Sequence, residues 1–217
     1  MDSNEARGQL QAAGRYLLTN DLAWGNAGNI SARLGPDRYL ITASGTRLGQ
    51  LGNDDFAECS FDGPLPGTRK PSKEIPMHRA IYEQRPEIGA ILHTSPFYST
   101  LIACTDVQLS GNWFVEDMYY LERVARVDYL HPGSAELGEA VHAKARQANI
   151  LLLENHGVLV YDISIQEALM GLQTLEMVCR MAITARSADL ELRSLPASTV
   201  ADFLMNSGYR PRREWPQ

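Results

Sequence analysis

The fold is decided by the stretch Ile150-Leu151-Leu152-Leu153-Glu154-Asn155-His156-Gly157, an apolar run that ends in a polar turn. Four consecutive apolar residues before a turn are typical of a strand that is buried on both faces of a sheet. A second run, Ile88-Gly89-Ala90-Ile91-Leu92-His93, has the same character and also ends at a histidine. We therefore expect His93 and His156 each to stand at the end of a buried strand.

Other elements are expected around these two strands. Asn29–Arg33 and Arg38–Thr42 flank the turn Gly35-Pro36-Asp37 and predict a hairpin. Helical spacing or capping signals predict helices around 10–17, from about 73–75 through 81, from 134 to 146, from 164 through 182 and from 199 to 206. We assign no element to 111–129. Strands that alternate with helices indicate a compact, layered α/β domain.

Length and composition limit the class of protein. The chain has 217 residues, of which 44% are hydrophobic and 21% charged, so it can bury one full core and we expect a single domain over residues 1–217. Lys and Arg number 20 against 26 Asp and Glu, which gives a net charge of −6. The only basic cluster is Arg210, Arg212 and Arg213 near the end, so the charge pattern argues against nucleic acid as a partner.

Targeting segments and redox chemistry are not indicated. The chain begins without an apolar run behind a basic start, and no 18 apolar residues follow one another, so we expect a cytoplasmic protein without signal peptide or membrane span. Cys59, Cys104 and Cys179 are odd in number and form no Cys-x-x-Cys pair. We interpret them as reduced packing residues without chemistry.

Three side chains could carry chemistry. Glu74 precedes a predicted helix, and His93 and His156 follow predicted strands. Imidazoles and a carboxylate from separate elements can converge on a divalent metal, which needs at least one open position for catalysis. Each histidine taken alone is equally consistent with a hydrogen-bonded residue at a sheet margin, and Glu74 with a group that complements a helix N-terminus. We interpret the remaining histidines, His78, His131 and His142, as structural or surface residues.

Two glycine-bearing corners follow the first helix and the hairpin. Gly25-Asn26-Ala27-Gly28 and Ser44-Gly45-Thr46 should lie close together in space. Backbone N–H groups in such turns can cradle a phosphate. The same residues could equally be turns that need positive φ, and composition does not separate these alternatives.

Five motifs in order give the chain a family resemblance. They are Gly25-Asn26-Ala27-Gly28-Asn29-Ile30-Ser31, Leu40-Ile41-Thr42-Ala43-Ser44-Gly45, Lys70-Pro71-Ser72-Lys73-Glu74, Ile91-Leu92-His93-Thr94-Ser95 and Leu152-Leu153-Glu154-Asn155-His156-Gly157. Over nearly its whole length the chain resembles the class II aldolase/adducin family, whose sugar-phosphate members include L-fuculose-phosphate aldolase. The resemblance implies a three-layer α/β/α sandwich around a mixed, largely antiparallel central sheet. It also implies a homotetramer with a divalent metal, usually zinc, near a subunit boundary.

The resemblance also implies roles for individual residues. Glu74 matches the carboxylate that moves a proton, and His93 and His156 match metal ligands. Tyr209 resembles a tyrosine that reaches a neighbouring subunit's site. The residues expected to bind substrate phosphate are Asn29, Ser44, Gly45 and Ser72, with Asn26 and Lys73 at positions where the fuculose-phosphate enzyme has hydroxyl residues.

One position departs from the family pattern. The metal strand of the family ends in His-x-His, whereas this chain has Ser95 in place of the third imidazole. Serine is a poor zinc ligand. Three accounts stay open: Glu74 joins the metal ligands permanently, Glu116 or Asp117 substitutes, or the site has lost its metal chemistry.

The implied activity is a metal-dependent carbon–carbon lyase of the aldolase type. Its substrate would be a small phosphorylated ketose or a related oxo-acid sugar, cleaved through an enediolate whose charge a cation stabilises. Glu74, with a pKa that burial raises, would move the proton. The alternatives are a decarboxylase, dehydratase or epimerase of the same family, or a catalytically silent oligomeric binding module.

Overall fold

The computed structural model describes residues 1–209, 213 and 215 and is built on one eight-stranded sheet. The strand order is β4-β3-β2-β1-β5-β8-β7-β6. The strands are β1 (Asn29–Arg33), β2 (Arg38–Thr42), β3 (Phe56–Ser60), β4 (Gly63–Pro64), β5 (Ala90–Thr94), β6 (Val124–Val127), β7 (Ile150–Leu153) and β8 (Gly157–Asp162). Only β6 and β7 run parallel, and the other neighbours are antiparallel. The expected mixed, largely antiparallel sheet is confirmed.

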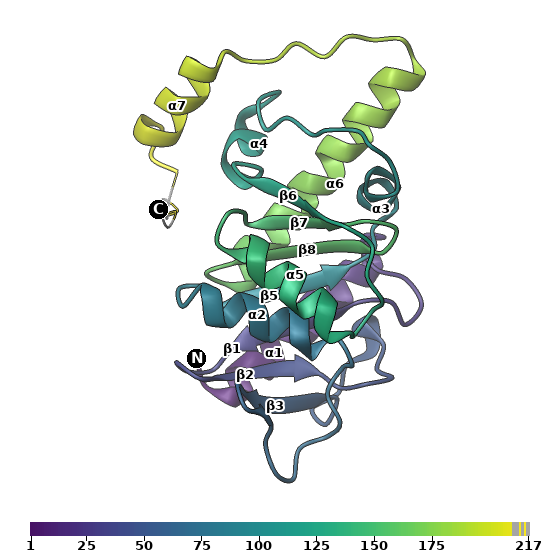
Figure 1. The fold of residues 1–217 in the computed structure, drawn as a ribbon, viewed down its shortest axis with the longest axis vertical. Coiled ribbons are helices and arrows are strands. Elements are labelled where there is room, and N and C mark those ends of the chain that lie inside the picture. The colour runs from purple at the N-terminus through teal and green to yellow at the C-terminus, as the bar shows by residue number, and fades with distance from the viewer. Residues whose placement is uncertain (210–212, 214, 216–217) are drawn as a thin grey trace.

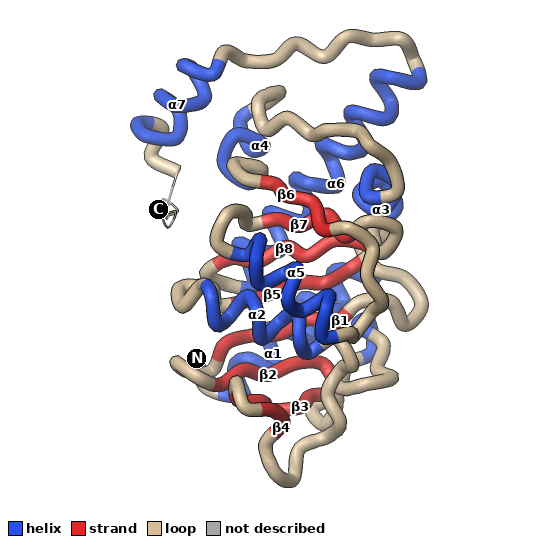
Figure 2. Tube along the Cα trace, in the orientation of Figure 1, coloured by secondary structure: helices blue, strands red, loops and turns tan. Residues whose placement is uncertain are grey.

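Helices cover both faces of the sheet (Figures 1 and 2). They are α1 (Ser3–Thr19), α2 (Ile75–Gln84), α3 (Phe97–Ala103), α4 (Val115–Tyr120), α5 (Ala135–Ala145), α6 (Ile165–Ser187) and α7 (Ala197–Asn206), with a short 3₁₀ turn η1 (Leu48–Gln50). One hydrophobic core lies between the sheet and α1, α3, α4 and α6, and a second lies between the sheet and α2 and α5. The fold is therefore the expected three-layer α/β/α sandwich.

Successive side chains of the central strands point to opposite faces of the sheet and so contribute apolar residues to both cores. In β5, Leu92 belongs to the first core and Ile91 to the second, as the period of two in a strand requires. In β8, Val160 and Leu159 divide in the same way. Both faces of these strands are apolar, which is why their sequences are continuous hydrophobic runs.

Local signals mostly place the elements where they were expected. The Ser134 and Ser164 hydroxyls accept hydrogen bonds from the backbone N–H groups of Leu137 and Glu167 and cap α5 and α6. The strand expected from residue 88 instead begins at Ala90. Strand β3 lacked a sequence signal, and 111–129, to which no element was assigned, contains α4 and β6.

Two expectations about polar residues need comment. Cys59 and Cys179 are buried, and burial raises their thiol pKa values to about 11 and about 12. Cys104 is exposed, so its interpretation as a packing residue was wrong.

Arg213 is buried and pairs with Asp162, whereas the other two arginines of the basic cluster lie outside the described residues. Within the described part of the chain, no helix is long and apolar enough to cross a membrane.

Candidate active site and metal centre

The three side chains singled out as a possible metal site meet in the structure. Nε2 of His93 lies 3.2 Å from Oε2 of Glu74, and Nε2 of His156 lies 3.1 Å from Oε1 of the same carboxylate. One ligand-type atom from each of the three residues falls within 4.8 Å of the others. The ring centroids of the two histidines are 4.8 Å apart. Residues as far apart in the sequence as Glu74 and His156 thus form one cluster.

The sheet explains this convergence. Strand β5 pairs with both β1 and β8, so His93 stands opposite Asn29 on one side and Leu159 on the other. His156 lies in the turn just before β8, beside the end of β5. Glu74 directly precedes α2 but makes no side-chain hydrogen bond to the helix N-terminus, and its carboxylate instead faces His93 and His156.

A glycine allows the first corner, Gly25–Gly28, to approach the strand that carries His93. Gly28 has φ +88°, and a Cβ at this position would lie 2.6 Å from the carbonyl oxygen of His93. Any other residue would push the corner away from β5. The Gly25–Gly28 turn is therefore held directly against the strand that carries His93.

Hydrogen bonds orient the ligand-type atoms. Nδ1 of His93 donates to the carbonyl oxygen of Val158 at 3.0 Å, which leaves the lone pair on Nε2, facing Glu74. Oε2 of Glu74 accepts from Nδ2 of Asn29 at 2.7 Å. Oε1 is buried and, despite its approach to His156, lacks a partner aligned for a hydrogen bond. A buried carboxylate oxygen without a donor is one that a cation could satisfy.

The ionisation of Glu74 differs from the expectation. Burial by itself raises the pKa of this carboxyl, but the two imidazoles that approach its oxygens, His156 and His93, outweigh burial. The net pKa of Glu74 therefore lies well below its ordinary value, not above it. The carboxylate is anionic at neutral pH, in the state that binds a metal or accepts a proton.

The donor set fits a divalent metal. Two imidazole nitrogens and one carboxylate form one of the known three-ligand sets of catalytic zinc sites, which leave further positions open. The Ser95 hydroxyl donates instead to the backbone carbonyl of His156 at 3.2 Å. This geometry favours the account in which Glu74 completes the set.

The acids of the 111–129 segment do not substitute for the missing imidazole. The Asp117 carboxylate accepts hydrogen bonds from the backbone of Trp113 and Phe114 and caps α4. Glu116 is exposed. Neither acid lines the pocket that holds Glu74. Their role is local to α4.

A pocket of about 540 Å³ opens above this cluster. Both glycine-bearing corners line it, as expected, and so does the start of α2. Its lining residues are Trp24, Asn26, Ala27, Gly28, Asn29, Ala43, Ser44, Gly45, Thr46, Ser72, Lys73, Glu74, His93, Ser95, Pro132 and His156. Among the described residues of this lining, Lys73 is the only lysine or arginine. One cavity thus joins the candidate phosphate residues to the candidate metal ligands.

Tyr209 lies elsewhere within the single chain. Its ring centroid is 5.3 Å from that of Tyr119 and 5.2 Å from that of Phe203, and it does not line the pocket. Tyr209 is therefore not part of the pocket of its own chain.

Two other residues lie near the site, although the sequence analysis did not predict them as site residues. Trp24 lines the pocket and donates from Nε1 to the backbone carbonyl of Ser95 at 3.1 Å, although its ring is largely exposed. His78 is fully buried and contacts Asn29. A usable signal did exist for His78, because it follows Glu74 by four positions and therefore shares its helix face.

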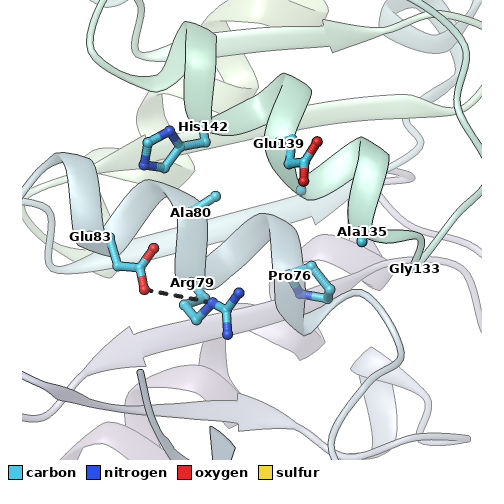
Figure 3. A pocket seen from close by; sticks show the side chains of 9 residues that line it. Pro76, Arg79, Ala80, Glu83, Gly133, Ala135, Glu139 and His142 are labelled. Carbon is cyan, nitrogen blue, oxygen red and sulfur yellow. Dashed lines mark ion pairs between the residues drawn. The ribbon is translucent and has the colours of Figure 1, made fainter. Parts of the chain in front are cut away.

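A second hollow, of about 490 Å³, lies between α2 and α5 (Figure 3). His142 of α5 is exposed there, and Arg79 and Glu83 of α2 form an ion pair with 3.6 Å between charged atoms. His131 is also exposed. These two histidines are surface residues, as expected.

Comparisons with known proteins agree with this geometry. Residues 8–183 match the family described as the Class II Aldolase and Adducin N-terminal domain, and the chain belongs to this family. It is similar to 3-oxo-tetronate 4-phosphate decarboxylase of Haemophilus influenzae (34% identity, 88% of this chain and 91% of the other). It is also similar to L-fuculose phosphate aldolase of Methanocaldococcus jannaschii (31% identity, 78% and 91%). The crystal structure of YgbL from Klebsiella pneumoniae superposes with a TM-score of 0.83 (30% identity, 93% and 99%). The chain is an enzyme of the class II aldolase superfamily.

Proposed function

We propose that this enzyme is a divalent-metal-dependent decarboxylase of a phosphorylated 3-oxo sugar acid. The observation that carries the proposal is the pocket that joins Glu74, His93 and His156 to the corner around Gly45 and Ser72. A 3-oxo acid phosphate has a carbonyl and a hydroxyl at one end and a phosphate at the other. The carbonyl and hydroxyl suit the side of the pocket with Glu74 and the two histidines, and the phosphate suits the side with Gly45 and Ser72. The similarity of the chain to a decarboxylase that acts on such a substrate also supports the proposal.

The phosphate end of the substrate is assigned to the corner opposite the histidines. Gly45 has φ +80°, which turns its backbone N–H away from the regular strand pattern and is typical of anion-binding turns. Ser44 and Ser72 add hydroxyl donors, and Lys73 adds a positive charge. The amide of Asn29 still has one free hydrogen after its bond to Glu74 and can donate it to the ligand.

Bond cleavage needs little beyond orientation and charge stabilisation. His93, His156 and Glu74 would hold the metal, for which we propose zinc, and its charge would stabilise the enediolate that forms. The substrate carboxylate is already ionised, so the C1–C2 bond breaks without a base. Its electron pair becomes the C2–C3 double bond, the carbonyl electrons move to oxygen, and carbon dioxide leaves.

One proton completes the reaction. C2 takes up a proton as the carbonyl forms again, so each turnover consumes one proton from water. Glu74 is the acid–base side chain that we assign to pass this proton to C2. Its depressed pKa makes the anion its resting state, so Glu74 must take this proton from water during the reaction.

Aldol cleavage is the second candidate function, favoured by the similarity to L-fuculose phosphate aldolase. A ketose 1-phosphate cleaved between C3 and C4 leaves the same phosphorylated three-carbon enediolate. The two reactions differ in the fragment that leaves, carbon dioxide in one and an aldehyde in the other. Release of an aldehyde requires removal of a hydroxyl proton at the start, and hence a free base.

The test uses protein purified without chelators. Bound zinc, manganese, iron and cobalt are quantified, and release of carbon dioxide and of aldehyde is measured with 3-oxo-tetronate 4-phosphate and with ketose 1-phosphates. We expect metal-dependent carbon dioxide release that a chelator abolishes. Aldehyde release alone would replace the proposal by the aldolase, and no turnover with any metal would overturn both.

A matched pair of variants tests the role of Glu74. Glu74→Gln keeps the shape of the side chain but removes its charge, and we expect turnover to fall by about 10²- to 10⁴-fold. Glu83→Gln makes the same change on the exposed part of α2 and should leave turnover unchanged. Equal rates for Glu74→Gln and the wild-type protein would contradict the assignment.

Assembly and location are also part of the proposal. We propose a cytoplasmic homotetramer in which Tyr209 serves the site of a neighbouring copy. Support comes from the distance of Tyr209 from its own pocket and from the family resemblance of the tail. Sedimentation would give the number of chains, and mixed tetramers of Tyr209→Phe and Glu74→Gln chains would regain activity if the sites were shared.

A further inference from the structure

A continuous chain of buried polar groups leads away from Glu74 into the protein. Nδ2 of Asn29 donates to Glu74, Oδ1 of Asn29 lies 2.6 Å from Nε2 of His78, Nδ1 of His78 lies 2.7 Å from Oγ of Ser31, and that oxygen lies 2.9 Å from the Tyr82 hydroxyl. All five residues are buried, His78 and Ser31 completely. The reaction proposed above uses only the Glu74 end of this chain.

Two sequence periods build the chain. Glu74, His78 and Tyr82 are spaced by four and share one face of α2 and its N-terminus, whereas Asn29 and Ser31 are spaced by two and share one face of β1. The helix face lies on the strand face, so residues from the two elements alternate along the hydrogen-bonded chain. Such interleaving fixes the height of α2 relative to β1.

The positions of the hydrogens along this hydrogen-bonded chain follow from Glu74, the group with which it begins. The Glu74 carboxylate only accepts hydrogen bonds, so Asn29 must present its NH₂ group to it and its oxygen to His78. Nε2 of His78 must then carry the hydrogen, and Nδ1 must accept one from Ser31. The Ser31 oxygen in turn accepts from Tyr82. In this arrangement each of the four hydrogen bonds along the chain has one donor and one acceptor.

The surroundings of His78 agree with this assignment. Burial, followed by the charge of His93, lowers the pKa of His78 to about 3, and only Glu74 opposes the shift. The imidazole is therefore neutral in the folded protein. Burial also raises the pKa of Tyr82, so the phenol remains a donor. A neutral imidazole with one donor and one acceptor is what the direction of the chain requires.

We propose that His78 is a positioning residue that, through the amide of Asn29, fixes the Glu74 carboxylate for metal binding and proton transfer. The proposal rests on the proposed function for the role of Glu74. Without the donor at Nε2, the Asn29 amide can rotate and turn its oxygen toward the carboxylate, where two acceptors repel. Glu74 would then lose the hydrogen bond from Asn29, the only aligned one that its side chain makes to the described residues, and its fixed place between His93 and His156.

Two amide variants of His78 separate positioning from simple packing. The side chain of His78→Gln reaches the place of Nε2 and can still donate to Asn29, whereas that of His78→Asn is one methylene shorter and reaches only the place of Nδ1, beside Ser31. Zn²⁺ affinity of each purified variant is measured by competition with a chelator, and kcat and KM are measured with the phosphorylated substrate.

The two variants should differ. We expect His78→Asn to lower Zn²⁺ affinity and kcat by about 10- to 100-fold, the usual effect of removing a group that orients a metal ligand, while His78→Gln stays within about threefold of the wild-type protein. KM should change little in His78→Gln, which keeps the Asn29 amide in place for the ligand. Equal losses in both variants would show a packing role and overturn the proposal.

A measurement on the unmodified protein keeps the test independent of folding and of activity. Nitrogen-15 NMR of metal-free wild-type protein reports which imidazole nitrogen of His78 carries the hydrogen. We expect the Nε2–H form, and the Nδ1–H form would overturn the inference. Failure of the decarboxylase assay would leave both this result and the Zn²⁺ affinities interpretable, so the two proposals fail separately.

Discussion

The buried, neutral state of His78 predicts how the stability of the protein depends on pH. Unfolding returns this imidazole to water, where its ordinary pKa of 6.5 applies, whereas burial holds the folded pKa at about 3. Between these values the unfolded state binds a proton that the folded state does not. Stability therefore falls as pH drops below 6.5, and the loss levels off near the folded pKa.

The magnitude follows from proton linkage. Between about pH 7.5 and about pH 5.0, His78 should remove about 2 kcal/mol from the free energy of unfolding, since each pH unit below the unfolded pKa contributes about 1.4 kcal/mol. This figure hardly depends on how far the folded pKa is depressed, because the folded imidazole stays neutral at both pH values. The groups that face it are Glu74 and His93, and their charges are already included in the shift.

Urea denaturation of metal-free protein at the two pH values gives the measurement. The loss of stability on acidification should be about 2 kcal/mol smaller in His78→Gln than in the wild-type protein. His142→Gln is the matched control, because its imidazole is exposed and stays in water in both states. Identical pH dependence of the wild-type and His78→Gln proteins would refute a buried neutral imidazole.

Three further predictions address the pocket. Ser95→His adds an imidazole beside the cluster and should raise Zn²⁺ affinity about tenfold in competition with a chelator; unchanged affinity would mean that the strand cannot present it. Lys73→Met should raise KM for a phosphorylated substrate about tenfold and leave an unphosphorylated analogue unaffected, because a phosphate contact contributes about 1–3 kcal/mol. Gly28→Ala should lower the free energy of unfolding in urea by about 1–3 kcal/mol through positive φ and the clash with His93. Gly25→Ala is its control, since it has positive φ without a neighbour within 4 Å, and an equal loss in both would exclude the clash.

Sequence patterns predicted the centre of the sheet better than its margins. The runs that became β5 and β7 are continuously apolar because both faces are covered, and the turn residues made the β1–β2 hairpin visible. Strand β3, Phe56-Ala57-Glu58-Cys59-Ser60, mixes polar and apolar residues near the edge of the sheet and carries no such signal. Strand β6 depends on parallel pairing with β7, a contact between distant segments that local sequence does not encode.

The residues of the candidate site could be predicted from the sequence, but their ionisation and side-chain orientation could not. Histidines at the ends of two buried strands, with an acid before a helix, were visible as separate residues, and their meeting follows from the antiparallel pairing of β5 with β8. The pKa of Glu74 was not predictable, because its sign depends on the distances to two imidazoles as well as on burial. The direction in which the Ser95 hydroxyl points is likewise a matter of local backbone geometry.

The replacement of an imidazole by Ser95 bears on which reaction the site can perform. In the site that we propose, which has two imidazoles, the Glu74 carboxylate completes the metal ligands, and a carboxylate engaged in this way is a poor base. Aldol cleavage needs a base at its first step, to remove a hydroxyl proton from the leaving fragment. Decarboxylation needs none until carbon dioxide has gone, when a single proton must reach C2. The proposed site, in which the acid–base residue is also a metal ligand, is therefore better matched to loss of carbon dioxide than to release of an aldehyde.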